Sequence, residues 1–278
     1  MRENKPMFDT ILSRIYEAIH WSMSDSDGLS TDFYYRVKAI RQDLLVMYKT
    51  NVTECQDFLR QNEEAFRQLD EKIITYEKQH ETTISQLMSG QSQLSDEALE
   101  EALQSKETFI ELYRSLYFAE RRLLTKDPQH LCHVGCGPMP ASILMWMKYT
   151  AANITAIDFD GQAIACAKVV FEQWRHTKNI PADRANFLTL PGEEVDYRNM
   201  DVIVISASIL NKENVYAAIL ATANREVTVI ERTPNFLYNQ AFTTPAGFEA
   251  FRLGGEARDN VNLQSYQFTP LSGVTHGK

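Results

Sequence analysis

The sequence predicts an α/β protein in which an N-terminal α-helical bundle precedes a doubly wound sheet of parallel strands. Helical periods run almost without interruption from Phe8 to about Leu124. No proline occurs between Pro6 and Pro128. After Pro128, short β-rich runs alternate with helical stretches, and this alternation indicates parallel strands joined by crossover helices. We therefore expect a helical domain at 1–126 and an α/β domain at 127–278.

Four helices are expected in the first domain. The apolar face of the first expected helix contains Ile11, Ile15 and Ile19. That of the second contains Val37, Ile40, Leu44 and Met47. The second helix is expected to begin after Ser30 or Thr31, which are good helix N-caps. A long third helix is expected between about 54 and 88, and a fourth, capped by Ser95, continues towards Leu124.

Five strands are expected in the second domain. Their sequences are "HLCHVG", "NITAID", "ANFLTL", "DVIVISAS" and "EVTVIER". Each run is short, apolar and bounded by polar or turn-forming residues, which is typical of buried strands in a parallel sheet.

Composition and charge exclude several classes of protein. The formal net charge is −9, and basic residues occur singly or in pairs, so we expect no nucleic acid partner. No N-terminal run resembles an export signal, and nowhere do about 18 apolar residues run together. We expect a cytoplasmic protein that does not bind a membrane.

The cysteines and histidines do not predict a metal site. The four cysteines lack a paired C-x-x-C spacing, which favours reduced structural thiols. His80 and Glu81 begin a zinc-protease-like pattern, but Ile84 stands where the second histidine ligand would be needed. No metal is therefore expected to take part in catalysis.

The stretch "HVGCGPMPAS" at 133–142 predicts a turn that receives a nucleotide cofactor. Glycines after a strand allow the backbone to approach a ligand closely, and an acidic residue about 20 positions later can bind ribose hydroxyls. Gly135, Gly137 and Asp158 fit these roles. The sequence therefore predicts a Rossmann-like domain, of the class I methyltransferase type, that binds an adenosine-containing ligand.

Two prolines in this turn favour S-adenosylmethionine over a dinucleotide. A dinucleotide turn presents backbone N–H groups to a pyrophosphate, whereas Pro138 and Pro140 each remove one such donor. S-adenosylmethionine carries no phosphate and needs fewer donors. The prolines either stiffen the turn to position the methionine tail or begin the next helix, where proline is favoured.

Three separated motifs resemble the nicotianamine synthase family. "GCGPMPASILMW" is similar to that family's G-S-G-P-L-P turn, and "IERTPNFLYNQ" is similar to its R-x-x-x-x-x-x-F-L-Y-P stretch. "YEKQHETTISQLM" resembles its E-A-E-x-x-x-E-x-H-Y segment. The chain also looks like the bacterial branch that makes opine-type metallophores, the histidine 2-aminobutanoyltransferases. It departs from the family pattern at Cys136, where serine is common, and in "AFTTPAGF" after the "FLY" stretch.

This resemblance implies the transfer of a 3-amino-3-carboxypropyl group from S-adenosylmethionine, as a co-substrate, with release of methylthioadenosine. The acceptor would be the α-amine of D- or L-histidine, and a partner opine dehydrogenase would then couple the product to an α-keto acid. Nicotianamine synthase proper, which condenses three donor molecules, and a small-molecule methyltransferase stay open as alternatives. A binding module with a vestigial site is a further alternative. A homodimer is compatible with an enzyme of this size.

The expected catalytic residues lie on two helices of the first domain. Projected at about 100° per residue, Glu77 lies about 20° from Phe66 and Ile84, so we expect its carboxylate against the core. Glu77 is the first choice for the base, and Glu81, about 40° further round, is the second. Tyr113 and Tyr117 share a helix face and resemble a tyrosine pair of the family, although such a stripe also suits core packing. The expected cofactor-binding residues are Gly135, Cys136, Gly137, Pro138, Asp158, Phe159, Ser206, Ser208, Arg232 and Tyr238.

Overall fold

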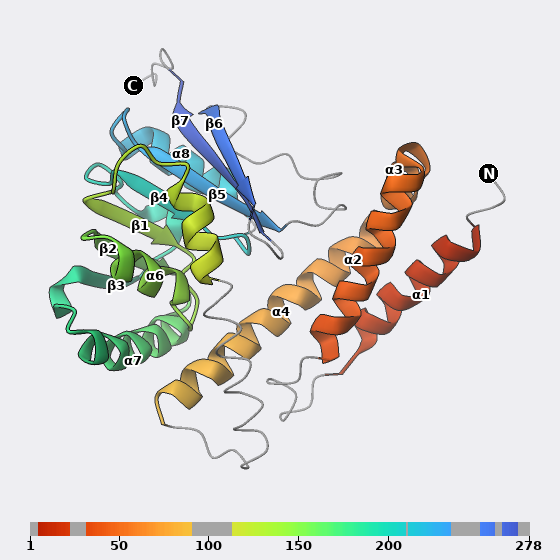
Figure 1. Cartoon of the computed structure of the whole chain (residues 1–278), viewed down its shortest axis with the longest axis horizontal. Helices are drawn as coiled ribbons and strands as arrows, with labels where there is room; N and C mark the ends of the chain where they lie inside the picture. Colours follow the sequence, from red (N-terminus) through yellow and green to blue (C-terminus); the bar gives the residue numbers. More distant parts are fainter. Residues whose placement is uncertain are drawn as a thin grey trace. The chain divides into compact units, whose positions relative to one another are not determined.

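The computed structural model describes residues 5–22, 32–90, 113–209, 211–234, 251–258 and 263–271. The chain divides into two compact units (Figure 1). Unit 1 comprises Met1–His80 and Asn235–Thr244, and unit 2 comprises Glu81–Pro234 and Pro245–Lys278. No described helix has the length and apolar character needed to cross a membrane.

The described part of unit 1 is helical, as the sequence predicts. Its helices are α1 (Lys5–His20), α2 (Asp32–Thr50), α3 (Val52–Gln61) and the first part of α4 (Glu63–Met88). The apolar residues predicted for the first two helix faces are buried, except that Ile19 is only partly buried. They pack with Phe66, Leu69, Ile73 and Tyr76 of α4 in one core.

One prediction about unit 1 is wrong, because the expected long helix at 54–88 is two helices. Asn62 separates them: its backbone N–H and its side-chain Nδ2 both donate to the carbonyl of Phe58, the latter at 2.8 Å. The apolar period continues through this position, so the pattern alone does not show the break. Asparagine competes for backbone hydrogen bonds and therefore favours helix ends.

Unit 2 contains a seven-stranded sheet of order β3-β2-β1-β4-β5-β7-β6. The strands are β1 (His130–Val134), β2 (Asn153–Asp158), β3 (Ala185–Thr189), β4 (Val202–Ile205), β5 (Thr228–Pro234), β6 (Phe251–Arg258) and β7 (Leu263–Pro270). The first five are parallel and correspond to the five predicted strands. Strands β6 and β7 were not predicted from the sequence, and β7 runs antiparallel to both its neighbours. The sheet is therefore mixed rather than wholly parallel.

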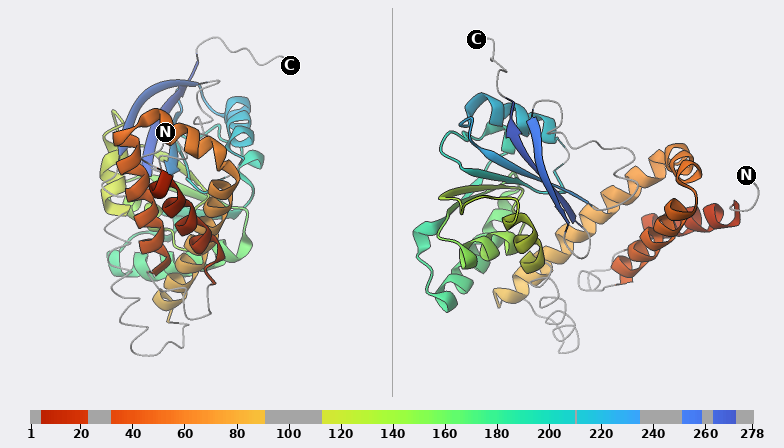
Figure 2. Two further views of the ribbon diagram at one scale, coloured as in Figure 1. Left: turned by 90° about the vertical axis from the view of Figure 1, so that its right-hand side faces the viewer. Right: turned by 45° about the horizontal axis from the view of Figure 1, so that its top comes forward.

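Helices cover both faces of this sheet. Helices α6 (Ala141–Tyr149) and α7 (Gly161–Lys178) lie on one side, together with a helical segment at 113–121, and α8 (Lys212–Thr222) lies on the other (Figure 2). Short 3₁₀ turns occur at Ala182–Arg184 and Gly192–Glu194. This arrangement confirms the Rossmann-like, class I methyltransferase-type fold expected from the sequence.

The division between the units falls within α4, whereas the sequence predicts a domain joint at 126/127. Buried residues of α4 occur on both sides of this division. Before His80 they include Ile73 and Tyr76, and after it they include Ile84 and Ser85. The end of α4 and the segment 113–121 therefore belong with the sheet.

Candidate functional site

The strand order of the sheet reverses at β1, because β2 and β3 lie on one side of it and β4 and β5 on the other. Ligands of open α/β sheets bind outside the carboxyl ends of the strands at such a switch point. The glycine turn follows β1 here, Asp158 ends β2 and Ser206 follows β4. The fold therefore brings together three predicted parts of the site that are distant in sequence.

The turn after β1 needs glycine at two positions. Gly135 and Gly137 have φ angles of 77° and 67°, which side chains with a Cβ rarely adopt. A Cβ on Gly135 would also lie 3.1 Å from the Cβ of Ser206. The N–H groups of Gly135 and Cys136 donate to the carbonyl of Ile157 at 2.8 and 3.0 Å, so the neighbouring strand fixes the turn.

Asp158 is tied to this turn by two hydrogen bonds. Its Oδ2 accepts from the N–H of Gly137 at 2.9 Å, and its Oδ1 accepts from the N–H of Asp160 at 3.0 Å. A carboxylate has about four lone-pair sites, so these bonds leave acceptor capacity for a ligand. The ring of Phe159, next along the chain, is 78% exposed. A carboxyl acceptor and an exposed aromatic residue therefore lie together at the end of β2.

The two prolines lie between the turn and α6. Both are buried, and Pro140 directly precedes the helix, where its carbonyl accepts from the N–H of Leu144 at 3.0 Å. This geometry supports the interpretation that the prolines begin α6. A role of Pro138 in positioning a ligand stays a prediction.

Cys136 is a buried, protonated thiol. Burial raises its pKa well above the usual value, and the negative charges of Asp158 and Glu81 raise it further. A thiol in this state is a poor nucleophile. Cys136 therefore contributes shape to the turn rather than covalent chemistry.

Glu81 contacts the glycine turn directly. If Gly137 carried a Cβ, that atom would lie 2.5 Å from Oε2 of Glu81, so the carboxylate occupies the space that the glycine leaves open. The hydroxyl of Tyr113 donates to Oε1 of Glu81 at 3.5 Å, at the long limit for a hydrogen bond. Both side chains are half-buried. The structure thus places a carboxylate and a phenol beside the turn.

Glu77 does not lie in the core, contrary to the sequence-based expectation. Its side chain is exposed, whereas the neighbouring Tyr76 is buried. Nearby protein atoms remove part of its hydration and raise its carboxyl pKa, and the charge of Arg41 opposes the shift. Solvent access limits such a shift. Phe66 and Ile84 lie at nearly the same helical angle and are buried, so the projection alone does not show that α4 is uncovered at Glu77.

Tyr117 belongs to an aromatic cluster instead of joining Tyr113 near Glu81. Its ring stacks on Tyr149 at 4.9 Å and meets Trp146 edge-on at 4.9 Å. It is buried, and burial raises the pKa of its hydroxyl. Tyr113 alone of the predicted pair contacts a predicted catalytic residue.

The two predicted serines differ in their surroundings. The hydroxyl of Ser206 donates to the carbonyl of Gly135 at 2.6 Å, and its N–H donates to the carbonyl of Val134 at 3.0 Å. Ser206 therefore holds the turn at the end of β4 through these two hydrogen bonds. Ser208 is exposed near the end of the same strand.

Arg232 lies among buried polar side chains of unit 2. It is 3% exposed, and its Nε and Nη2 donate to the two carboxylate oxygens of Glu120 at 2.7 and 2.8 Å. Its Nη1 lies 3.2 Å from Nε2 of His133. Arg232 was expected among the cofactor-binding residues, but in this structure its guanidinium is bonded to protein partners.

The partners of Arg232 were not predicted from the sequence. Glu120, His133 and Ser265 are all buried. Glu120 lies seven residues after Tyr113 and therefore on the same helix face. This spacing was the one sequence signal that linked Glu120 to the predicted site residues. The predicted site residue Tyr238 lies outside the described residues.

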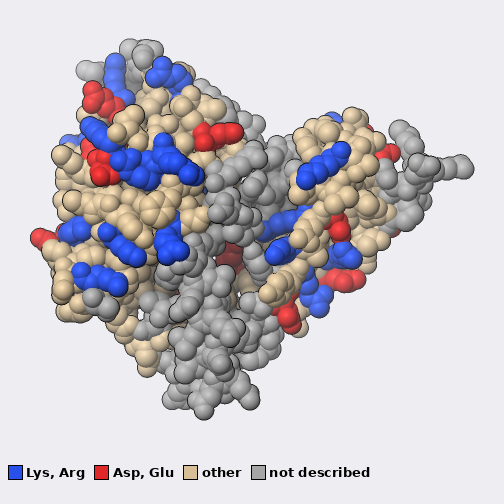
Figure 3. Space-filling view, viewed as in Figure 1, with Lys and Arg blue, Asp and Glu red and all other residues tan. Residues whose placement is uncertain are grey.

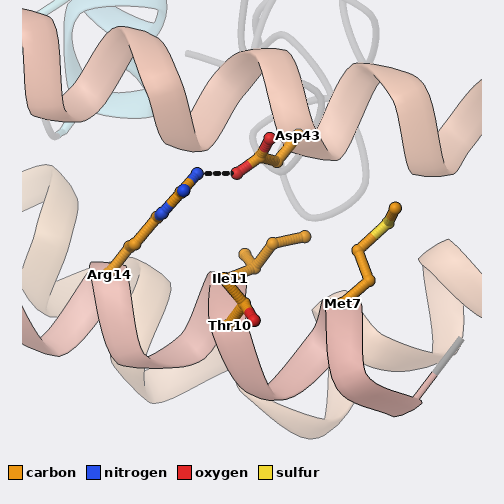
Figure 4. Close-up of a pocket in the computed structure, with 5 residues that line it drawn as sticks. All are labelled: Met7, Thr10, Ile11, Arg14 and Asp43. Carbon is orange, nitrogen blue, oxygen red and sulfur yellow. Dashed lines mark hydrogen bonds and ion pairs between the residues drawn. The ribbon is translucent and has the colours of Figure 1, made fainter.

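Two surface features lie outside this constellation. A hollow in unit 1 between α1 and α2 is lined by Met7, Thr10, Ile11, Arg14 and Asp43, and Arg14 and Asp43 form an ion pair (Figure 4). None of the predicted site residues lines it.

On unit 2, Lys and Arg side chains are interspersed with acidic ones (Figure 3). Among the described residues, no cluster of three or more potential metal ligands occurs.

The topology and the glycine turn define unit 2 as a class I methyltransferase-type Rossmann domain. The chain as a whole has a nicotianamine synthase-like fold: it is similar to MtNAS in complex with MTA and tNA, with a TM-score of 0.72 and 17% identity. That alignment covers 98% of this chain and 99% of the other.

A second solved structure is similar over the same length. It is a glutamate-to-glutamine mutant of MtNAS in complex with S-adenosylmethionine, with a TM-score of 0.65 and 16% identity, covering 98% of this chain and 100% of the other. The chain matches no protein-family model and no curated protein. These similarities establish the fold.

Proposed function

We propose that the protein transfers the 3-amino-3-carboxypropyl group of S-adenosylmethionine to the α-amine of histidine and releases methylthioadenosine. The observation that carries this proposal is the position of Glu81, whose carboxylate fills the space beside Gly137. Transfer to an amine requires a base, and a base beside the donor turn meets that need. The likeness to MtNAS, which is known in complex with S-adenosylmethionine and with MTA, supports this class of transfer.

The residues at the carboxyl ends of the strands suit S-adenosylmethionine. Asp158 offers acceptor sites for ribose hydroxyls, and the exposed ring of Phe159 offers an aromatic face for the nucleoside. Pro138 and Pro140 reduce the number of backbone donors in the turn, which disfavours a pyrophosphate and suits a ligand without phosphate.

The proposed reaction needs one proton acceptor and one positioned electrophilic carbon. Glu81 takes a proton from the acceptor's ammonium group, and the neutral amine forms a C–N bond with the γ-carbon of the methionine moiety. The bond between that carbon and sulfur breaks, and its electron pair stays on sulfur as the neutral thioether methylthioadenosine. Which of the three sulfonium substituents reacts is decided by the carbon held in line with the amine.

Product analysis tests this proposal. The purified protein is incubated with S-adenosylmethionine and either D- or L-histidine, and the released nucleoside is identified by mass spectrometry. Methylthioadenosine with a mass increase of one aminobutyrate on histidine supports the proposal. S-adenosylhomocysteine would indicate a methyltransferase, methylthioadenosine without use of histidine would indicate nicotianamine synthase chemistry, and failure to bind S-adenosylmethionine in calorimetry would indicate a binding module.

The product is further proposed to serve a metallophore pathway. A histidine that carries one aminobutyrate unit retains a primary amine, which a reductive coupling to an α-keto acid can alkylate. An opine dehydrogenase is the class of enzyme that catalyses this step, so we propose such an enzyme as the next in the pathway.

Asp158→Asn is expected to weaken S-adenosylmethionine binding by about 10- to 100-fold, because hydrogen bonds to a charged group contribute about 1.5–3 kcal/mol. Isothermal titration calorimetry measures the effect. Asp160→Asn is the matched control: it removes the same charge two residues away, where Asp160 caps α7 through the N–H of Gln162 at 2.8 Å. Equal affinity losses in the two variants would contradict a specific role of Asp158.

Gly137→Ala is expected to lower both stability and turnover. The left-handed backbone costs a residue with a Cβ about 1–2 kcal/mol, and the new methyl group would displace the Glu81 carboxylate. Gly90→Ala is the control, because Gly90 has a φ of 68° but nothing within 4 Å of an added Cβ. Urea unfolding should show similar destabilisation of both variants, and only Gly137→Ala should slow methylthioadenosine release. Equal turnover in the two variants would contradict the contact with Glu81.

A further inference from the structure

A buried polar cluster ties the helical segment 113–121 to the sheet of unit 2. It consists of Glu120, His133, Arg232 and Ser265, which we call the Glu120 cluster, and each member is at most 3% exposed. Its members come from four elements: the helical segment, β1, β5 and β7.

The carboxylate of Glu120 accepts three hydrogen bonds within this cluster. Nε and Nη2 of Arg232 donate at 2.7 and 2.8 Å, and the hydroxyl of Ser265 donates to Oε1 at 2.8 Å. The two parallel bonds from Arg232 fix both the distance and the angle between helix and sheet, since a bidentate pair is planar and directional.

His133 completes the cluster as a neutral acceptor. Burial and the adjacent charge of Arg232 lower its pKa well below the usual value. Nε2 of the neutral ring can then accept from Nη1 of Arg232 at 3.2 Å. The cluster therefore contains one negative and one positive charge that neutralise each other.

The same helix face carries the phenol that reaches the candidate base. Tyr113 and Glu120 are seven residues apart, about two turns, so their side chains project from one side of the helix. Glu120 is held against β5 and β7 at one end of the segment, and Tyr113 lies against Glu81 at the other.

We propose that Glu120 and Arg232 are positioning residues, which hold the segment 113–121 so that Tyr113 orients the Glu81 carboxylate beside the glycine turn. A buried ion pair is seldom more stabilising than apolar residues of similar size, so stability alone does not account for it. A role in fixing the position of the segment 113–121 accounts for the ion pair. The catalytic part of this inference rests on the proposed function.

The test replaces the pair by apolar residues of similar size. The double variant Glu120→Leu/Arg232→Met leaves no unpaired buried charge, and Arg232→Lys keeps the charge while losing the bidentate geometry. Tyr216→Phe is the matched control, because Tyr216 donates a buried hydrogen bond at 2.9 Å to Glu231, next to Arg232 on β5. Circular dichroism and thermal melting establish that each variant is folded.

Steady-state kinetics should show a fall in kcat of tenfold or more for both cluster variants, with calorimetric affinity for S-adenosylmethionine within threefold of the parent. When Tyr113→Phe is already present, the cluster replacement should cause no further loss, because both changes act through the same phenol. Parental kcat in a folded cluster variant, or full additivity with Tyr113→Phe, would overturn the proposal.

Hydrogen exchange separates this inference from the proposed function. Amides 114–121 should exchange at least tenfold faster in the double variant and at the parental rate in Tyr216→Phe. If the parent protein released no methylthioadenosine, the proposed function would fail, and these exchange rates would still decide whether the cluster fixes the segment. Unchanged exchange in the double variant would overturn the positioning role.

Discussion

Replacing Glu81 by glutamine is expected to slow turnover by about 10²- to 10⁴-fold, the range associated with loss of a general base. Glutamine has nearly the same shape and can still fill the space beside Gly137, but it cannot take a proton from the acceptor amine. Binding of S-adenosylmethionine should change little. Single-turnover release of methylthioadenosine and isothermal titration calorimetry measure the two effects separately.

Glu77→Gln is the control for this experiment. It lies one helical turn earlier on α4 and its side chain is exposed, so its replacement should slow turnover far less. If Glu77→Gln abolished turnover while Glu81→Gln kept the parental rate, the assignment of the base would move to Glu77.

Arg232→Met is expected to lower the free energy of unfolding by about 3–5 kcal/mol, because it leaves a buried carboxylate without its counter-charge. Glu120 is 0% exposed and would keep only the hydrogen bond from Ser265 among those described for its carboxylate. Urea unfolding at neutral pH measures the loss as a lower midpoint with an unchanged slope.

Adding Glu120→Leu to Arg232→Met should recover most of this stability, since the uncompensated charge is then removed. Such recovery is the signature of a buried ion pair. An Arg232→Met variant with the parental unfolding midpoint would show that Arg232 and Glu120 are solvated, in contradiction to the structure.

Local signals explain why much of the fold could be predicted. The five parallel strands and the glycine turn are each recognisable within a few residues, through apolar runs and glycine spacing. The hairpin of β6 and β7 depends on pairing between segments, and two glycines weaken the strand pattern of β6. The break at Asn62 was missed because the helical period continues across it.

The site was predictable to the extent that it depends on local sequence. Asp158 and the glycines were found from their spacing, and the structure brings them together. The pairing of Arg232 with Glu120 was not predicted, because the two residues are 112 positions apart and no local pattern reveals such a pair. A helical projection gives the angle between Glu77 and Glu81, but the surfaces that cover each turn of α4 depend on the tertiary fold.

The protonated state of Cys136 affects how readily the protein is alkylated. A sulfonium is an alkylating agent, and a thiolate is among the strongest nucleophiles that a polypeptide contains. If the thiol of Cys136 were ionised, the proposed donor could alkylate it and inactivate the protein. Burial and the negative charges of Asp158 and Glu81 raise the pKa of Cys136, so the turn can contain a cysteine beside the proposed sulfonium donor without being alkylated by it.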